Sequence, residues 1–243
     1  MDHLSRTFGH DAVEPAVRRA RVRAVFDAIA VRYDLMNDLM SGFMHRGWKA
    51  RFVAGVTAPV EGPIVDLAGG TGDIAERLLR RMPGREVAIV DPSTAMLGVA
   101  ARRLGPKVPL VAAEGEALPF TDASLGAMTL AFGLRNMTEP GRAMAEAFRA
   151  LKPGARLHIL EFSQPDRWFE WPYRLYSRIT IPLLGALVAR DRNAYRYLVD
   201  SIEIFPSAED VSQTLADAGF VDVRVEKLMF GVAAIHVASK PAE

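Results

Sequence analysis

Three aspartates around a glycine-rich turn are the side chains of this sequence whose types and spacing most clearly suggest chemistry. Asp66 and Asp73 bracket the run Ala68-Gly69-Gly70-Thr71-Gly72, and a following apolar run ends in Asp91. Glycine tolerates positive φ and has no Cβ, so this turn can bend sharply and bring its backbone close to a ligand. A carboxylate at Asp91 can accept hydrogen bonds from both hydroxyls of a ribose. The spacing therefore predicts a nucleotide-binding turn between two strands.

Two nucleotide cofactors fit this turn. The pattern Gly70-x-Gly72-x-x-Ala75 satisfies the relaxed dinucleotide fingerprint, and Asp91 stands near the offset of about 20 residues expected for a ribose-binding acid. Against NAD, Asp66 and Asp73 would place two negative charges beside a pyrophosphate at a helix N-terminus. S-adenosylmethionine carries a sulfonium and an ammonium group and no phosphate, so these acids suit it better. An ordinary strand-to-helix turn would not explain the acid that ends the next strand.

Apolar runs that alternate with helical patterns predict an α/β fold with a doubly wound, mostly parallel sheet. We expect strands at residues 64–67, 87–90, 109–112, 127–131, 156–161, 221–228 and 232–239. Helices should lie between them, the first ending near Arg81 and the others covering residues 94–104, 139–151 and 208–218. The turn Lys152-Pro153-Gly154 should end the helix that precedes the fifth strand. This order places the glycine turn after the first strand and Asp91 at the end of the second.

Two segments lie outside this alternation. Residues 1–56 are expected to form a helical extension, with its leading residues disordered, ahead of a sheet domain at 57–243. Between about residues 163 and 205 the alternation is replaced by a Pro-punctuated apolar run and by aromatic residues, namely Trp168, Phe169, Trp171, Tyr173 and Tyr176. An insertion of this length in a compact sheet usually serves as a lid or a binding element.

The composition excludes several classes of partner and site. Thirty basic against 29 acidic side chains leave a net charge of +1, so no nucleic-acid partner is predicted, and the basic run 18–23 is interpreted as a solvated helix face. The absence of cysteine excludes disulfides, thiolate zinc sites and cysteine nucleophiles, and fits a cytoplasmic location. No metal site is predicted, because His, Asp and Glu do not cluster at ligand spacing. The apolar run 179–189 is shorter than the ~20 residues that span a bilayer, so no membrane-spanning helix is predicted. The kind of membrane association that remains open is peripheral contact with the inner membrane surface.

Longer motifs carry a resemblance to a known family. They are YDLMNDLMS at 33–41 followed by His45 and Trp48-Lys49, DLAGGTGD at 66–73, EALPF at 116–120, FGLRN at 132–136 and YRYL at 195–198. In this order they resemble the ubiquinone/menaquinone biosynthesis C-methyltransferase family, within the class I S-adenosylmethionine-dependent methyltransferases. The glycine turn alone is a weak signal, whereas YDLMNDLMS together with FGLRN is a strong one. The resemblance implies a Rossmann-like, seven-stranded, mostly parallel sheet and S-adenosylmethionine as the cofactor.

The resemblance also implies which residues hold the cofactor. They are Asp66, Ala68, Gly70, Thr71, Gly72, Asp91, Met96, Glu114, Gly115 and Ala131. At Glu114-Gly115 the family usually has Asn or Asp followed by Ala, and Glu114 can still accept a hydrogen bond from the adenine amino group. Relatives often have Ser at Ala131, so any hydroxyl contact from this position is lost.

The implied reaction transfers a methyl group from sulfur to a ring carbon of a polyprenylated benzoquinol or naphthoquinol. Carbon attacks well only when a ring hydroxyl ionises, so the enzyme has to favour the quinolate. Arg135 and Asn136 are the candidates for stabilising its charge, and Tyr33 and His45 are candidate proton acceptors. Two of these have structural alternatives: Arg135 could pair with a carboxylate such as Glu139, and His45 could be a packing residue.

Other interpretations stay open at this point. An NAD(P)-dependent oxidoreductase would need a proton donor such as a Tyr-x-x-x-Lys pair after the fourth strand, where the sequence has none. A non-catalytic scaffold in a quinone-synthesis complex would explain the altered Glu114 and Ala131, although the glycine turn and Asp91 argue that the cofactor binds. Tyr195 and Tyr197 could bond a substrate oxygen or pack in the core. The sequence does not distinguish benzoquinol from naphthoquinol, or a homodimer from a larger complex.

Overall fold

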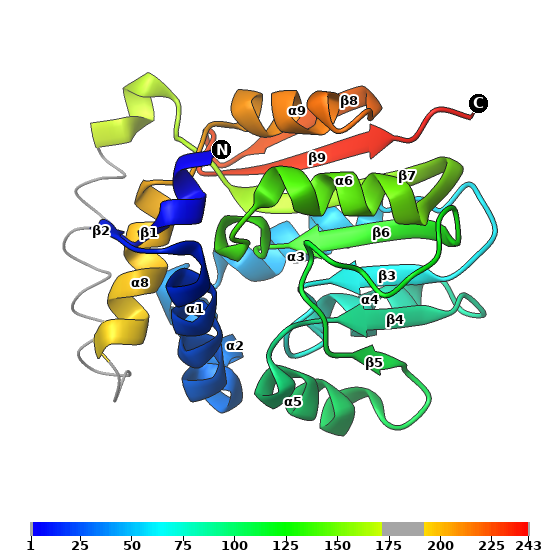
Figure 1. Cartoon of the computed structure of the whole chain (residues 1–243), viewed down its shortest axis with the longest axis horizontal. Helices are drawn as coiled ribbons and strands as arrows, with labels where there is room; N and C mark the ends of the chain where they lie inside the picture. Colours follow the sequence, from blue (N-terminus) through cyan, green and yellow to red (C-terminus); the bar gives the residue numbers. More distant parts are fainter. Residues whose placement is uncertain (1, 172–191, 243) are drawn as a thin grey trace.

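The computed structural model of the chain describes residues 2–171 and 192–242, which are built around a seven-stranded sheet (Figure 1). The strand order is β5-β4-β3-β6-β7-β9-β8, and β9 runs antiparallel to both of its neighbours. The strands are β3 (Ile64–Leu67), β4 (Val87–Val90), β5 (Leu110–Val111), β6 (Leu125–Ala131), β7 (Leu151–Phe162), β8 (Val221–Leu228) and β9 (Ala233–Ser239). The predicted α/β class and the mostly parallel sheet are confirmed.

Helices cover both faces of this sheet, which explains why every residue of β3 and β4 is buried and why Asp66 is the one polar side chain in these two strands. On one face, α6 (Pro140–Ala150) and α9 (Ala208–Asp217) contribute to a core that also contains Val65 and Leu67 of β3. On the other, α3 (Met44–Gly55), α4 (Asp73–Arg81) and α5 (Thr94–Leu104) contribute to a core that also contains Ile64 and Ile89. The alternating side chains of each strand therefore serve two separate cores.

A third group of helices lies at the end of the sheet toward which β3, β4 and β6 point (Figure 1). It consists of α1 (Pro15–Ile29), η2 (Ala30–Arg32), α2 (Tyr33–Met40) and α8 (Arg192–Glu203). Val22 of α1 and Met36 of α2 pack with Met96 of α5 and Tyr197 of α8 in a small core. These helices thus stand over the carboxyl ends of the parallel strands, where α/β proteins bind ligands.

The leading residues are ordered, so the prediction that they are disordered is wrong. Asp2–Arg6 form the short helix η1, and Thr7–Phe8 (β1) pairs with Asp11–Ala12 (β2) in a small hairpin. Leu4 is only 1 % exposed and belongs to the main core. Burying a leucine contributes about 1.5–3 kcal/mol, which offsets part of the ordering cost of this segment.

The segment Lys152-Pro153-Gly154 is part of a strand and not the turn that the sequence predicted. Helix α6 ends at Ala150 and β7 begins at Leu151. Pairing with β6 shifts from Leu125–Leu151 to Ala127–Arg156, so Lys152–Gly154 lie in a bulge between these two registers.

The predicted lid is described only in part, because residues 172–191 lie outside the described residues. Residues 167–171 are helical, and α8 begins at Arg192. Within the ranges 2–171 and 192–242, no helix combines the length and the apolar character needed to span a membrane.

Candidate active site

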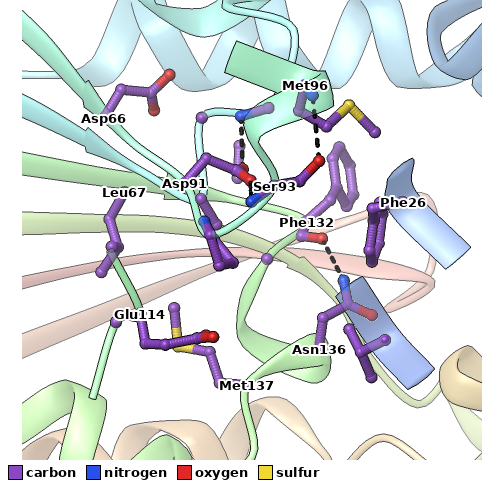
Figure 2. A pocket seen from close by; sticks show the side chains of 18 of the residues that line it. Phe26, Asp66, Leu67, Asp91, Ser93, Met96, Glu114, Phe132, Asn136 and Met137 are labelled. Carbon is purple, nitrogen blue, oxygen red and sulfur yellow. Dashed lines mark hydrogen bonds between the residues drawn. The ribbon is translucent and has the colours of Figure 1, made fainter. Parts of the chain in front are cut away.

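A cavity lies at the carboxyl ends of β3, β4 and β6, and α1 forms one of its walls (Figure 2). All but one of the predicted cofactor residues line it, namely Asp66, Ala68, Gly70, Thr71, Asp91, Met96, Glu114, Gly115 and Ala131. The exception is Gly72, which begins α4 and packs against α5: a Cβ there would lie 2.9 Å from Leu104 Cδ1. Helix α1 contributes Val22, Arg23 and Phe26.

Asp91 organises the turn between β4 and α5 as well as the glycine turn. Its Oδ2 accepts a hydrogen bond from the Gly70 amide at 2.9 Å, and its Oδ1 accepts one from the Ser93 amide at 2.9 Å (Figure 2). Desolvation by burial raises the pKa of Asp91 to about 6, against the opposing effect of these two amides. Each carboxylate oxygen retains a lone pair, so Asp91 can accept two further hydrogen bonds from the cavity.

Asp66 presents an unsatisfied carboxylate oxygen at the cavity wall. Its Oδ1 accepts a hydrogen bond from Thr129 Oγ1 at 2.8 Å, whereas Oδ2 is buried without a well-aligned donor among the described residues, although the Ala75 amide is near enough to act against the rise in the pKa of Asp66. Burial raises the pKa of Asp66 to about 7. Gly69 leaves the space beside it free, since a Cβ there would lie 2.8 Å from Asp66 Oδ2. A buried acceptor without a donor suits a ligand that brings a cationic N–H group.

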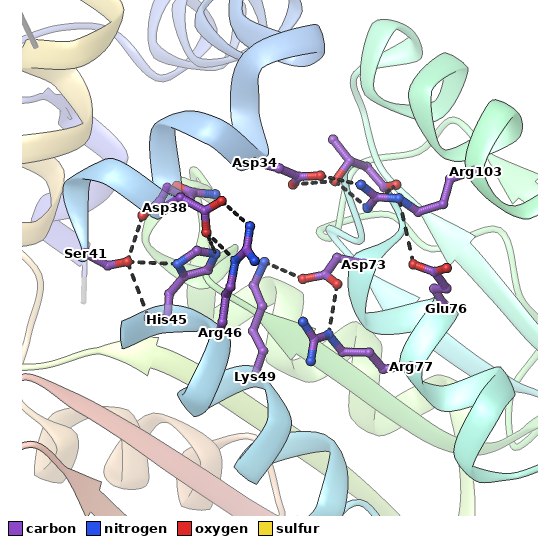
Figure 3. Close-up of polar contacts among 12 residues, drawn as sticks. Asp34, Asp38, Ser41, His45, Arg46, Lys49, Asp73, Glu76, Arg77 and Arg103 are labelled. Atoms are coloured by element: carbon purple, nitrogen blue, oxygen red, sulfur yellow. Dashed lines mark hydrogen bonds and ion pairs between the residues drawn. The ribbon is translucent and has the colours of Figure 1, made fainter. Parts of the chain in front are cut away.

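Asp73, the other acid of the glycine turn, is already paired (Figure 3). Its two oxygens lie 2.9 Å from Lys49 Nζ and 2.9 Å from Arg77 Nε. Burial would raise its pKa, but the charges of Lys49 and Arg77 prevail and lower the pKa of Asp73 to about 2. The negative charge that the turn offers a ligand therefore comes from Asp66 and Asp91 and not from Asp73.

Helix α2 is linked to the glycine turn through Thr71. Thr71 Oγ1 donates a hydrogen bond to Asp34 Oδ1 at 2.9 Å, and Arg103 of α5 donates to the Thr71 carbonyl at 3.0 Å. Arg103 also forms an ion pair with Asp34. Asp34 of the YDLMNDLMS motif thus helps to hold the glycine turn in place.

The unusual pair Glu114-Gly115 has partners that account for both residues. Glu114 forms an ion pair with Arg23 of α1, across the cavity wall. Gly115 lies against Met137, because a Cβ would be 2.9 Å from Met137 Cε. The Met137 side chain therefore occupies the space that the methyl group of an alanine would take at position 115.

Arg135 lies behind the cavity wall and forms a buried ion pair. It is 3 % exposed, and its Nη1 donates to Glu161 Oε1 at 2.7 Å and to the Phe132 carbonyl at 2.6 Å. Glu161, at the end of β7, is 1 % exposed. The sequence offered Glu139 as the partner of Arg135, which is wrong: Glu139 lies 3.7 Å from Arg142 instead.

Asn136 and Tyr33 are the candidate catalytic residues that line the cavity. The Asn136 side chain is held at both ends, since its Nδ2 donates to the Phe132 carbonyl at 3.2 Å and its Oδ1 accepts from Tyr197 Oη at 3.0 Å. The Tyr33 ring packs edge-on against Phe26 with the ring centroids 5.9 Å apart. The side chain of Tyr195, which the sequence grouped with Tyr197 as a possible partner of the substrate, lies outside the described residues.

His45 is part of a network between α2 and α3 and is not among the cavity-lining residues (Figure 3). Its Nδ1 lies 2.8 Å from Ser41 Oγ, and its Nε2 lies 3.7 Å from Asp38 Oδ1. Desolvation and the nearby charge of Lys49 lower the pKa of His45 to about 4. The imidazole is therefore neutral near pH 7, and its contacts are those of a residue that joins two helices.

The basic run 18–23 is a solvated face only in part: Arg21 and Arg23 are exposed, whereas Arg18 is 2 % exposed, and Arg23 pairs with Glu114. Sequence reasoning missed Arg18 and Arg23. The spacing of Arg18, Val22 and Phe26 at four-residue intervals would have placed them on one face of a helix, and this face turns toward the cavity. The apolar pattern of that face was the available signal.

The sequence is similar to known proteins over most of its length. The model of the ubiE/COQ5 methyltransferase family matches residues 15–240. The ubiquinone/menaquinone biosynthesis C-methyltransferase UbiE of Rubrivivax gelatinosus is 46 % identical over 98 % of this chain and 94 % of its own length. The mitochondrial 2-methoxy-6-polyprenyl-1,4-benzoquinol methylase of Caenorhabditis elegans is 41 % identical over 96 % of this chain and 85 % of its own.

Solved structures agree on the fold. A possible histamine N-methyltransferase of Thermotoga maritima superposes with a TM-score of 0.65 at 19 % identity, covering 90 % of this chain and 99 % of that chain. Phosphoethanolamine N-methyltransferase 2 of Haemonchus contortus, in complex with S-adenosyl-L-methionine, superposes with a TM-score of 0.60 at 14 % identity, covering 80 % of this chain and 52 % of that one. At these identities, the solved structures show that the chain shares their fold.

Proposed function

The chain belongs to the ubiE/COQ5 methyltransferase family, as its motifs predicted, and we propose that it methylates a ring carbon of a polyprenylated quinol with S-adenosylmethionine as the methyl donor. The names of its relatives support a quinone-biosynthesis substrate and give no support to an NAD(P)-dependent oxidoreductase or a scaffold. The observation that carries the proposal is one cavity that combines the unpaired oxygen of Asp66 with the carboxylate of Asp91.

The residues of the cavity fit S-adenosylmethionine. We expect Asp91 to accept hydrogen bonds from the ribose hydroxyls and Asp66 Oδ2 to accept one from the ammonium group. Glu114 would face the adenine amino group. When bound, the cofactor supplies an electrophilic methyl group. The protein has to hold that group in line with the ring carbon and exclude water.

Among the candidate catalytic residues, we propose that Asn136 and Tyr33 face the quinol, because both line the cavity. Asn136 can donate a hydrogen bond to a ring oxygen as negative charge develops there. Arg135 does not line the cavity and would act indirectly, because it holds the Phe132 carbonyl and with it the segment that carries Asn136. We place His45 last, because its nitrogens face Ser41 and Asp38.

We extend the proposal to contact with a membrane surface, where a polyprenylated substrate resides. Trp168 and Trp171 are 64 % and 73 % exposed, and Trp168 stacks edge-on against Phe230, with the ring centroids 4.7 Å apart. Aromatic side chains of this kind favour the boundary between lipid and water.

The direct test is methyl transfer by the purified protein. We expect S-adenosylmethionine to add one methyl group to the reduced form of a short-tailed 2-methoxy-6-polyprenyl-1,4-benzoquinol, of a demethylmenaquinol, or of both, as read by mass spectrometry of the quinol. NADH should not bind in a calorimetric titration. Binding of S-adenosylmethionine without methylation of either quinol would contradict the proposed substrate, and no binding would contradict the proposed cofactor.

The affinity for S-adenosylmethionine should depend on pH. The pKa values of Asp66 and Asp91 are raised to about 7 and about 6, and only their ionised forms accept all the proposed hydrogen bonds. As pH falls through these values both groups take up protons, so affinity should fall. We expect a loss of about tenfold or more between about pH 8 and pH 5.5, measured by calorimetry. In Asp66→Asn the fall in affinity should begin about one pH unit lower, because only Asp91 then titrates. A dissociation constant of the wild type that does not change with pH would contradict the roles proposed for Asp66 and Asp91.

A further inference from the structure

Arg18 is a buried cation whose hydrogen bonds converge on a single backbone segment. It belongs to α1 and is 2 % exposed. Its Nη1 donates to the carbonyls of Asn136 at 3.0 Å and Met137 at 2.9 Å, and its Nη2 donates to the carbonyl of Arg135 at 3.0 Å. One guanidinium group therefore satisfies three successive carbonyls of η3 (Leu134–Asn136) and of the residue after it.

Another donor of this guanidinium, Nε, holds a second segment at the same place. Arg18 Nε donates to the Thr7 carbonyl of β1 at 2.7 Å. The planar fork of arginine, with five N–H donors, can serve carbonyls on several sides at once. Burying the charge is costly, so its contacts need to be well formed to offset that cost. Such an arrangement holds its surroundings in one geometry.

The segment that Arg18 holds carries Asn136, a cavity-lining residue. Tyr197 and the Phe132 carbonyl fix the ends of the Asn136 side chain, at 3.0 Å and 3.2 Å. Arg18 fixes the backbone from which this side chain projects. The direction of the Asn136 amide therefore depends on all three contacts.

The same helix also forms part of the cavity wall. Val22, Arg23 and Phe26 of α1 line the cavity, and Arg23 pairs with Glu114. Displacing α1 would withdraw this wall and the support of Asn136 together.

We propose that Arg18 is a positioning residue for methyl transfer, which holds the backbone of residues 135–137 so that the Asn136 amide faces the reacting ring. The proposal rests on the proposed function. It links the position of α1 over the cavity to the alignment of Asn136, so that Arg18 contributes to catalysis without contact to the substrate.

The test compares Arg18→Met, which removes all donors, with Arg18→Lys, which retains the charge and part of the hydrogen bonding. We expect Arg18→Met to lower kcat by about tenfold or more, because misplacement of a positioning group by about 1 Å can cost up to 100-fold. KM for the quinol and Kd for S-adenosylmethionine should change by less than about threefold. Arg18→Lys should recover most of kcat. The matched control is Arg21→Lys on the exposed side of the same helix, which should leave kcat unchanged.

A double-mutant cycle separates positioning from mere support of the fold. If Arg18 acts through Asn136, then Arg18→Met in an Asn136→Ala background should lower kcat no further. Independent effects that multiply would overturn the proposal, as would an unchanged kcat in Arg18→Met. Should Arg18→Met not fold, Arg18→Gln takes its place, since it keeps amide donors without a buried charge.

Hydrogen exchange gives a readout that does not require turnover. Arg18→Met should speed amide exchange at residues 134–138 by about tenfold or more relative to Arg21→Lys. Unchanged protection there would overturn the positioning role even if the wild type methylated neither quinol. A wild type that binds S-adenosylmethionine but is inactive would instead contradict the proposed substrate, so the two failures are distinguishable.

Discussion

Asp91→Ala is expected to weaken the binding of S-adenosylmethionine by at least about 100-fold. The carboxylate accepts the amides of Gly70 and Ser93 at 2.9 Å each, and we propose that it also accepts both ribose hydroxyls. Hydrogen bonds to a charged group contribute about 1.5–3 kcal/mol each, so the loss of two corresponds to about 3–6 kcal/mol. The glycine turn would also lose the acceptor that orders the Gly70 amide.

Calorimetric titration with S-adenosylmethionine and S-adenosylhomocysteine measures this effect. Asp122→Ala is the matched control, because its side chain is 79 % exposed and pairs with Arg149, away from the cavity. We expect the control to bind like the wild type. A dissociation constant of Asp91→Ala within about threefold of the wild-type value would remove Asp91 from the ribose site.

The elements that the sequence predicted most accurately are those whose pattern is local. The strands at 64–67 and 87–90 have the predicted bounds, because short and mostly apolar runs between turn residues identify buried parallel strands. The N-terminal hairpin was missed because long-range contacts hold it, among them the bond from Arg18 to the Thr7 carbonyl. A bulge replaced the turn at Lys152–Gly154 for a similar reason, since its pairing depends on β6.

The residues of the site were likewise predictable where one local motif defines them, and not where their position depends on contacts far apart in the sequence. The glycine turn and Asp91 were predictable because a few residues of one motif define them. The partner of Arg135 was not, because Glu161 is 26 residues away and reaches it only through the order of strands in the sheet. The pairing of β3 with β6 likewise sets Thr129 beside Asp66 and leaves one oxygen of Asp66 free for a ligand.

Arg135→Ala should lower the free energy of unfolding by about 3–5 kcal/mol, which makes it the substitution with the largest expected effect on stability. The guanidinium is the partner of Glu161, and both side chains are buried, at 3 % and 1 % exposure. Without the guanidinium, the donors that remain to the Glu161 carboxylate among the described residues are the backbone amides of residue 135 and Phe162, at 3.2 Å and 2.9 Å. An uncompensated charge in this position is costly. Chemical denaturation followed by circular dichroism would measure the change.

The double variant Arg135→Met with Glu161→Gln separates this structural cost from a role in turnover. Replacing both charges removes the uncompensated carboxylate, so we expect the double variant to regain most of the lost stability. If Arg135 also aligns the segment that carries Asn136, turnover should stay at least about tenfold below the wild type although the protein is folded and binds S-adenosylmethionine. Recovery of turnover together with stability would assign the pair to the fold alone. In that event Asn136 and Tyr33, which line the cavity, would be the remaining candidates for contact with the quinol ring.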